Sequence, residues 1–287
     1  MASALPAAQR KSFDWPKNRT RRDTTLSKSI SLRIVSAASS ANTVVPISLL
    51  LLRMGEKTKA RGKIIGILGG MGPEATVELF KRIIEKTPIH KDQDHLRVII
   101  YNNPVIPDRT QAILHGGESP LFLLKQTAQV LEKAGADCIA IPCNSAHYYL
   151  DGIGEAVKIS ILDMIGRTAL AIKEPVIGLM ATEGTVRAGL YHHACANRGI
   201  EVLTPEETDQ EKIMHIIYGI KAGKEKLPLK EMSNGVVKRL QERGAKAVMA
   251  GCTELSLVMK QDKMDIPLYD ALDIPAQAAV NKALSVT

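Results

Sequence analysis

Two of the four cysteines, Cys143 and Cys252, stand in similar local sequences in the two parts of the chain. Each follows an apolar run that predicts a buried strand, and each precedes polar residues, in Pro142-Cys143-Asn144-Ser145-Ala146-His147 and Gly251-Cys252-Thr253-Glu254. Ligands of open α/β sheets bind at the carboxyl ends of the strands. A thiol there would open the next helix, whose amide groups would lower its pKa from about 8.5. We therefore expect two reactive thiols at ligand-binding edges.

Two such thiols suit one reaction class. If two similar halves face each other across a pseudo-twofold axis, Cys143 and Cys252 meet in one cleft. A base on one face of a Cα–H group then removes the proton, and an acid on the opposite face returns one, which inverts the centre. A thiol with a slightly lowered pKa can serve in either role near neutrality. Cys138 and Cys195 have no counterpart in the other half, so we expect them to be buried hydrophobic residues.

An internal repeat supports the two halves. The landmarks recur in the same order and at nearly constant spacing: Ile65-Gly66-Ile67-Leu68 as Ile177-Gly178-Leu179-Met180, Cys143 as Cys252, and Ile159-Ser160-Ile161-Leu162-Asp163 as Ile266-Pro267-Leu268-Tyr269-Asp270. A recurring set of landmarks is the signature of duplicated structural units. We predict an α/β fold of two similar, pseudo-twofold-related domains, residues 64–160 with 271–287 and residues 161–270. Each is a mainly parallel sheet flanked by helices, with the active site in the cleft between them.

The elements that position the cysteines follow from hydrophobic patterning. Short β-branched runs alternate with amphipathic stretches, which is typical of a parallel sheet covered by helices. The expected strands are Ile64–Leu68, Arg97–Tyr101, Cys138–Pro142, Ile159–Leu162, Val176–Met180, Ile200–Leu203, Ala247–Ala250 and Pro267–Tyr269. The expected helices include Pro73–Lys86, Pro120–Ala134, Glu206–Lys221, Leu229–Glu242 and Ile274–Leu284.

The charge of the chain is unevenly distributed. The 287 residues carry a formal net charge of +8, which by itself would favour a nucleic-acid or membrane-surface partner. Residues 1–62 hold 12 Lys and Arg against 3 Asp and Glu, whereas the remainder holds 26 against 27. The body of the protein is therefore neutral. This distribution argues against nucleic-acid and membrane partners.

Residues 1–62 are predicted to be a basic, disordered extension. Residues 1–53 are rich in Ser and Arg, like a targeting segment, and Arg21-Arg22 resembles a twin-arginine signal only faintly. Translation starting at Met54 is the competing interpretation. The apolar run Val44–Leu52 is too short to span a bilayer, which needs about twenty residues. Four cysteines without CxxC spacing argue against disulfides and predict a cytoplasmic protein.

The body resembles the PLP-independent aspartate/glutamate racemase family, and within it the aspartate racemases. The motifs that carry the resemblance are Gly69-Gly70-Met71-Gly72-Pro73-Glu74-Ala75-Thr76, Asn103-Pro104 through Ile106-Pro107-Asp108-Arg109-Thr110, and the two cysteine segments. The resemblance covers residues 64–287 in order. It implies interconversion of L- and D-aspartate, with glutamate as a further substrate, by two-thiol proton transfer at Cα. It also implies no cofactor, a small amino-acid ligand and a homodimer.

The resemblance also implies roles for individual residues. Cys143 and Cys252 would be the two acid/base groups. The substrate-binding residues would be Met71, Arg109, Asn144, Ser145, Thr182, Lys224 and Thr253. His147 and Glu254 would either tune the thiols or only bond backbone groups. Many relatives have Thr where Ser145 stands, a change that keeps the hydroxyl.

Other functions fit the sequence less well. Gly70-x-Gly72-x-x-Ala75 matches a dinucleotide fingerprint, but the second strand ends at Tyr101-Asn102-Asn103 without the acidic residue that binds a ribose. No HExxH motif or similar spacing predicts a metal. A Cys143–His147 hydrolase leaves Cys252 unexplained. A related cysteine-dependent enzyme of the maleate isomerase or hydantoin racemase type stays open, as does a non-catalytic two-lobed binding protein.

Overall fold

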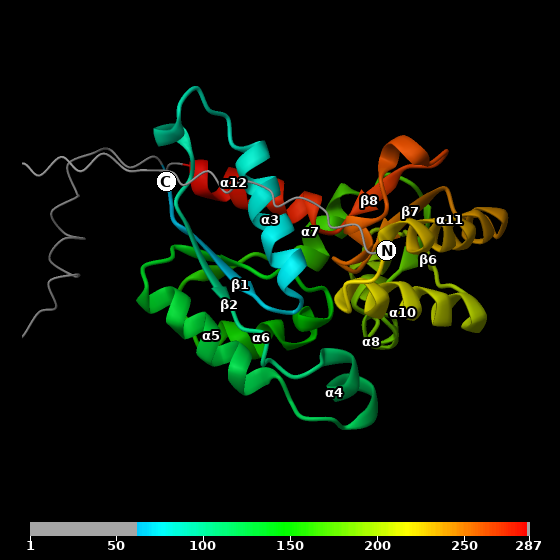
Figure 1. Cartoon of the computed structure of the whole chain (residues 1–287), viewed down its shortest axis with the longest axis horizontal. Coiled ribbons are helices and arrows are strands. Elements are labelled where there is room, and N and C mark those ends of the chain that lie inside the picture. The colour runs from blue at the N-terminus through cyan, green and yellow to red at the C-terminus, as the bar shows by residue number, and fades with distance from the viewer. Residues whose placement is uncertain (1–61, 286–287) are drawn as a thin grey trace, which may run out of the picture. The chain divides into compact units, whose positions relative to one another are not determined.

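The computed structural model describes residues 62–285, which contain two four-stranded parallel sheets (Figure 1). The first sheet has the order β2-β1-β3-β4 and the second β6-β5-β7-β8. The strands are β1 (Ile65–Gly69), β2 (Val98–Asn102), β3 (Cys138–Ala140), β4 (Ser160–Ile161), β5 (Val176–Met180), β6 (Glu201–Leu203), β7 (Ala247–Ala250) and β8 (Leu268–Asp270). Each predicted strand is present, and several are shorter than expected. The identical strand order confirms the predicted α/β fold of two similar halves.

The helices follow the strands as a parallel sheet requires. The longer ones are α3 (Pro73–Lys86), α5 (Leu121–Lys133), α10 (Glu207–Lys221), α11 (Lys226–Glu242) and α12 (Asp273–Leu284). Shorter helices are α4 (Arg109–His115), α6 (Leu150–Gly154), α7 (Met164–Ala171), α8 (Glu183–Arg187) and α9 (Leu190–Ala196), with 3₁₀ turns η1 (Asp92–Asp94), η2 (Ser145–Tyr149), η3 (Leu255–Leu257) and η4 (Gln261–Lys263). The five predicted helices are confirmed, whereas the short ones were not predicted.

The repeated glycine in the central strand of each half has a packing reason. A Cβ added to Gly66 in β1 would lie 3.0 Å from Ala136 and 3.4 Å from Leu131 of α5. A Cβ added to Gly178 in β5 would lie 3.0 Å from Leu240 of α11. A side chain at either position would therefore force the residues packed over the sheet to shift, because protein interiors leave little spare space.

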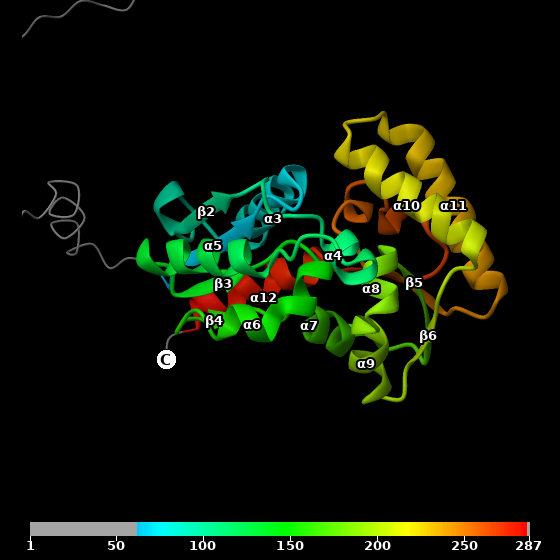
Figure 2. The ribbon, with the colours of Figure 1, turned by 90° about the horizontal axis from the view of Figure 1, so that it is seen from below.

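The C-terminal helix returns to the first half of the molecule. Ala276, Ala279 and Val280 of α12 share one core cluster with Leu79 and Ile83 of α3. Figure 2 shows α12 beside α7. The apolar side chains of α7 are divided between the two halves, because its first residue joins this cluster and its later residues join a cluster of the second half. These two helices therefore tie the halves together.

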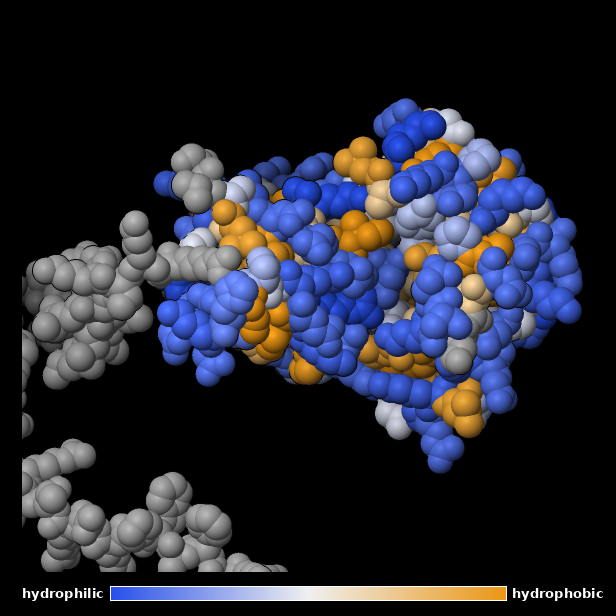
Figure 3. Space-filling model, turned by 90° about the horizontal axis from the view of Figure 1, so that it is seen from above, coloured by the Kyte–Doolittle hydropathy of each residue, from blue (hydrophilic) through white to orange (hydrophobic). Residues whose placement is uncertain are grey.

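The surface of the described part is mixed. The face seen in Figure 3 is mainly hydrophilic, with apolar residues in separate patches. Within residues 62–285, no helix is both long and apolar enough to cross a membrane. The predictions made for the N-terminal extension fall on residues 1–61, which lie outside the described part of the chain.

Candidate active site

The two cysteines occupy equivalent places in the two halves. Cys143 lies just beyond the carboxyl end of β3, and Cys252 just beyond that of β7. Both side chains are buried, with 4% and 6% of their surface exposed. Each is followed by a 3₁₀ turn, η2 or η3, and not by the α-helix that the sequence predicted. A short 3₁₀ turn aligns few peptide dipoles, so it offers a thiolate little of the stabilisation expected from a helix end.

The loops that carry the cysteines contact each other. The Thr253 hydroxyl, next to Cys252, donates a hydrogen bond of 3.3 Å to the carbonyl of Pro142, next to Cys143. The buried Tyr191 hydroxyl of α9 donates to the Asn144 side-chain oxygen at 2.5 Å. Both bonds run from the second half to the first. The fold therefore brings the two cysteine segments together at the junction of the halves.

Cys252 has a carboxylate as its immediate neighbour. Its thiol donates to Glu254 Oε2 at 3.0 Å, and Glu254 is only 3% exposed. Burial raises the pKa of Cys252 well above its usual range, and the negative charge of Glu254 raises it further, while Lys221 opposes the shift. The expectation of a lowered thiol pKa is therefore wrong for Cys252, because burial and the charge of Glu254 outweigh Lys221 and the backbone amide of Glu254.

Arg109 provides a buried cation on the Cys143 side. It is the first residue of α4, and only 6% of its surface is exposed. Its guanidinium donates to the carbonyls of Ile106 at 3.2 Å, Pro107 at 2.8 Å and Met71 at 3.2 Å. Burial lowers the pKa of Arg109, but Cys143 and other negative groups raise it by more, so the net shift is upward. Arg109 thus stays charged and rigidly oriented.

A cavity of about 470 Å³ opens between the two halves beside these groups. Its wall comes from the β1–α3 turn, the loop after β2, the end of α10 and Glu254. The lining residues are Gly70, Met71, Gly72, Pro73, Glu74, Pro104, Ile106, Asp108, Arg109, Ile220, Lys221, Gly223 and Glu254. Neither cysteine is among these lining residues, although Glu254, the hydrogen-bond acceptor of Cys252, is one of them. The predicted cleft between the halves is therefore present as a pocket that ends at Glu254 and Arg109.

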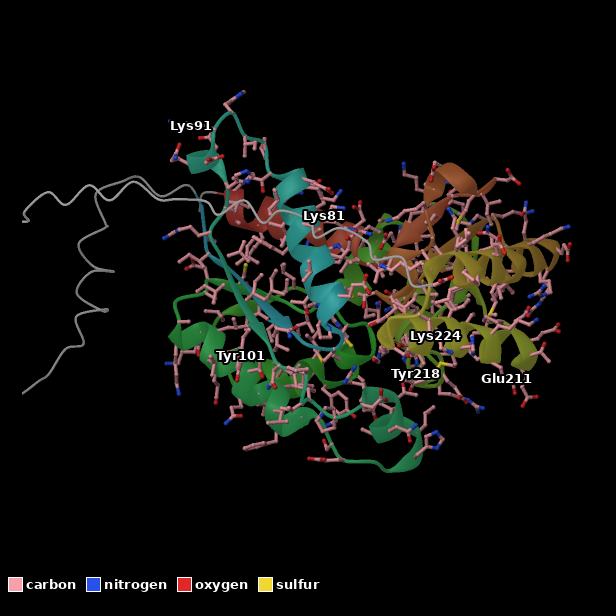
Figure 4. All side chains as sticks on the ribbon, viewed as in Figure 1. Lys81, Lys91, Tyr101, Glu211, Tyr218 and Lys224 are labelled. Atoms are coloured by element: carbon pink, nitrogen blue, oxygen red, sulfur yellow. The ribbon has the colours of Figure 1, made fainter. Side chains whose placement is uncertain are left out.

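The second cation on the cavity wall is Lys221, the last residue of α10. The predicted Lys224 is not among the lining residues, and its role in substrate binding stays a prediction. Figure 4 shows Lys224 and Tyr218 at the end of α10 nearest the first half, with Glu211 at the other end. Lys221 is exposed. Partial desolvation lowers the pKa of its ammonium, but Glu254, Cys252 and Cys143 raise it by more, so the ammonium stays charged. The helical spacing of α10 could have indicated Lys221 from the sequence. Lys221 stands one helical turn after Ile217, which is buried, and so lies on the same face of the helix.

The remaining predicted binding residues are all buried, and several already have protein partners. Met71 lines the cavity, and Ser145 Oγ lies 3.6 Å from Cys143 Sγ. The Thr182 hydroxyl caps α8 by accepting the Thr185 amide at 3.2 Å. Asn144 Nδ2 and Arg109 Nε are buried donors that lack an acceptor within residues 62–285. These two free donors suit an anionic ligand.

His147 bonds backbone groups, one of the two roles considered for it. Its Nδ1 lies 2.9 Å from the Cys143 carbonyl, and its Nε2 accepts the Met164 amide at 3.1 Å. Because Nε2 must be free of a proton to accept that bond, Nδ1 carries the hydrogen and the ring is neutral. Burial lowers the pKa of His147. The ring therefore clamps the Cys143 loop to the start of α7.

We expect the stabilisation by His147 to weaken with acid. Below about pH 6.5 the unfolded chain protonates this histidine while the folded chain resists, so the free energy of unfolding falls as pH falls. The melting-temperature difference between the wild type and His147→Asn should shrink from about pH 7.5 to about pH 5.5. His90→Asn, at an exposed histidine, is the control and should show no such trend. A constant or growing difference for His147→Asn would contradict the neutral clamp.

Comparisons with known proteins agree with this geometry. The model of the Asp/Glu/Hydantoin racemase family matches residues 68–279. A broad specificity amino-acid racemase from Bacillus subtilis is 26% identical over 228 residues, which cover 77% of this chain and 99% of that protein. The structure of an aspartate racemase from Picrophilus torridus matches with a TM-score of 0.68 and 31% identity, over 77% of this chain and 94% of that one. A putative Asp/Glu racemase from Yersinia pestis matches with a TM-score of 0.65 and 29% identity, over 78% and 100%.

The chain therefore belongs to the Asp/Glu/hydantoin racemase family. At this level it is an amino-acid racemase, an isomerase that acts on a small molecule. A glutamate racemase from Francisella tularensis shares the fold at 19% identity and a TM-score of 0.57, over 79% of this chain and 84% of that one. The predicted domain boundaries, the homodimer and the roles of single residues stay predictions.

Proposed function

We propose that this protein interconverts L- and D-aspartate, and also acts on glutamate, by proton transfer at Cα between two thiols without a cofactor. The contact between Thr253 and Pro142 carries the proposal, because it joins the two cysteine segments of a repeated fold. The 31% identity with the aspartate racemase from Picrophilus torridus favours aspartate. The broad specificity of the Bacillus subtilis relative is the reason to test other amino acids as well.

The proton balance of the reaction is simple. One cysteine, as the thiolate, takes the Cα proton from one face of the amino acid. The other, as the thiol, gives its proton to the opposite face. The Cα centre is inverted, and the enzyme finishes with its proton on the first sulfur. The negative charge that develops in the substrate carboxylate is stabilised by Arg109 and by the buried amide donor of Asn144.

The cavity fits a small dicarboxylate. Arg109 and Lys221 put two cations on one wall, as two carboxylates would require. The volume of about 470 Å³ is in the ordinary range of small-ligand pockets. Asp108 on the same wall supplies a carboxylate that can accept the substrate amino group as the third recognised feature. An amino dicarboxylic acid therefore satisfies the charges of the site.

The most informative experiment follows deuterium from solvent into Cα. The full chain is incubated in deuterated water with each of a panel of L-amino acids, without added PLP, and exchange and inversion are measured by NMR and chiral chromatography. We expect exchange with aspartate first and glutamate second, accompanied by inversion. If no amino acid exchanges, the racemase proposal is wrong for amino acids, and hydantoins and maleate become the substrates to test.

Substitutions of the two lysines near the end of α10 should have clearly different effects on kcat/KM. Lys221→Gln should lower kcat/KM for aspartate about 10- to 100-fold, as expected for a lost charge-assisted hydrogen bond. Lys224→Gln, which removes the same charge outside the cavity wall, should leave kcat/KM close to that of the wild type. Steady-state racemisation followed by circular dichroism measures both. A larger loss for Lys224→Gln than for Lys221→Gln would reject this placement of the carboxylate site.

A further inference from the structure

We propose that Glu254 is a positioning residue that breaks the symmetry of the two thiols. It holds a proton on Cys252, so that Cys143 is the sulfur that begins the reaction as the thiolate. The inference rests on the two-thiol function proposed above. It goes further by assigning different resting states to two cysteines that the repeat makes equivalent.

The asymmetry lies at one pair of matched positions. The residue two places after Cys143 is Ser145, whose Oγ is 3.6 Å from the sulfur. The residue two places after Cys252 is Glu254, whose Oε2 is 3.0 Å from the sulfur. A hydroxyl can donate to a thiolate or accept from a thiol, whereas an ionised carboxylate can only accept. The Cys252–Glu254 contact therefore requires a hydrogen on sulfur, while the Cys143–Ser145 contact permits a thiolate.

The surroundings of Glu254 maintain this arrangement. Its Oε2 accepts the Cys252 thiol and also lies 3.3 Å from the Thr253 hydroxyl, whose single hydrogen is shared with the Pro142 carbonyl. Its Oε1 lies against Gly72, within 3.5 Å of where a Cβ of that residue would stand. Within residues 62–285 no Lys or Arg nitrogen lies within 4.0 Å of this carboxylate. A buried carboxylate without a close cation keeps its bond to the thiol, because that bond is one of the few that satisfy it.

The two cations of the site divide between the sulfurs, because among the charged groups Lys221 interacts most strongly with Glu254 and Cys252, and Arg109 with Cys143. The Arg109 guanidinium interacts most strongly with Cys143, and Glu254 is a weaker contributor to its raised pKa. Burial and Glu254 together raise the pKa of Cys252. A negative charge on Cys252 is therefore opposed in the resting site, although Lys221 offsets part of this effect.

This assignment defines the proton flow for the enantiomer whose Cα proton faces Cys143, and the opposite enantiomer reacts by the reverse flow. The Cys143 thiolate takes the Cα proton, and Cys252 gives the proton that Glu254 held in place. The product complex then has a Cys143 thiol and a Cys252 thiolate beside Glu254, which is the less stable distribution. A proton exchange with solvent restores the resting form. Since the two enantiomers are equal in free energy, kcat/KM is equal in both directions. The asymmetry must therefore be measured by titrating the thiol itself.

The test is a thiolate titration of Cys252 by ultraviolet absorbance. In a full-length Cys143→Ala background, the signal of Cys252 is the difference from the Cys143→Ala/Cys252→Ala variant. Adding Glu254→Gln should lower the titration midpoint of Cys252 by about one to three pH units, as expected when a like charge is removed at this distance. Glu74→Gln is the matched control. It removes the same charge from the same cavity wall, but Glu74 pairs with Lys226 and not with a thiol.

Each outcome of the titration either supports or overturns the role of Glu254. A midpoint lowered by Glu254→Gln and unchanged by Glu74→Gln supports the proposal. No shift with either variant, or equal shifts with both, overturns it. Glu254→Asp moves the carboxylate away from the sulfur by one methylene, so it should lower the titration midpoint of Cys252 by a smaller amount. This variant replaces Glu254→Gln in the test if the glutamine variant does not fold. An unshifted midpoint in that aspartate variant would likewise overturn the proposal.

A kinetic measurement links the titration to the reaction. With both cysteines present, the alkaline limb of the kcat/KM profile for aspartate reports the essential acid of the free enzyme. Glu254→Gln should move this limb to lower pH by as much as it moves the Cys252 titration, and an unmoved limb would overturn the assignment. If no amino acid is racemised, the two-thiol function fails while the titration still decides whether Glu254 holds the Cys252 proton.

Discussion

Cys143→Ala and Cys252→Ala should each lower the rate of aspartate racemisation by about 10²- to 10⁴-fold, the usual contribution of a positioned acid or base. Each substitution removes one of the two sulfurs between which the Cα proton passes. The other cysteine cannot replace it, because inversion requires a base and an acid on opposite faces of the substrate. Circular dichroism of L- and D-aspartate, starting from either enantiomer, measures the loss. Both directions should be affected in each variant.

Cys195→Ala is the matched control for this experiment. Cys195 is as buried as the two candidate residues, but it lies in α9 among the apolar side chains of the second half. Its replacement should leave the racemisation rate close to that of the wild type, although it will lower the stability slightly. If either Cys143→Ala or Cys252→Ala racemises aspartate at the wild-type rate, the two-thiol mechanism is incorrect.

Arg109→Lys should be the next most damaging change, with kcat/KM for aspartate reduced at least about thirtyfold. This corresponds to about 2 kcal/mol, the lower end of the cost of truncating a buried charged group. Lysine keeps the charge but has no planar fork, so it cannot hold the carbonyls of Met71 and Pro107 and a substrate carboxylate together. The loss should therefore persist although the net charge of the site is unchanged.

The control for Arg109→Lys is Arg187→Lys. Arg187 is exposed on α8 and makes an ion pair with Glu183 that is worth little in water. The kcat/KM of the Arg187→Lys variant should match that of the wild type. Thermal unfolding of both variants shows whether the protein is folded at the assay temperature. A loss of less than about threefold for Arg109→Lys would mean that the fork geometry is not used in substrate binding.

The strands and long helices could be predicted because their signals are local. The β-branched runs and the repeated glycine of β1 and β5 are visible in the sequence, and each expected strand is found within about two residues of its predicted bounds. The short helices could not be predicted in the same way. Elements such as α8, with five residues, are too short to show a helical period and form because neighbouring elements hold them.

The candidate site was predictable in its residues and less so in its electrostatics. The repeat marked Cys143 and Cys252, and the family motifs marked Arg109. That Lys221 lines the cavity could not be predicted, because it depended on where α10 ends and on which side of that end faces the cavity. The raised pKa of Cys252 depended on the burial of Glu254 beside it, which two-residue spacing alone does not reveal.

The sequence by itself therefore determined the two-half α/β fold, the racemase family and the pair of cysteines, because these follow from periodicity, repetition and motif order along the chain. Only the tertiary structure decided that Thr253 of one half meets Pro142 of the other, that Lys221 lines the cavity and that the two cysteines have different neighbours. These facts depend on distances between residues far apart in the chain and on exclusion of water, which arise only when the halves pack together.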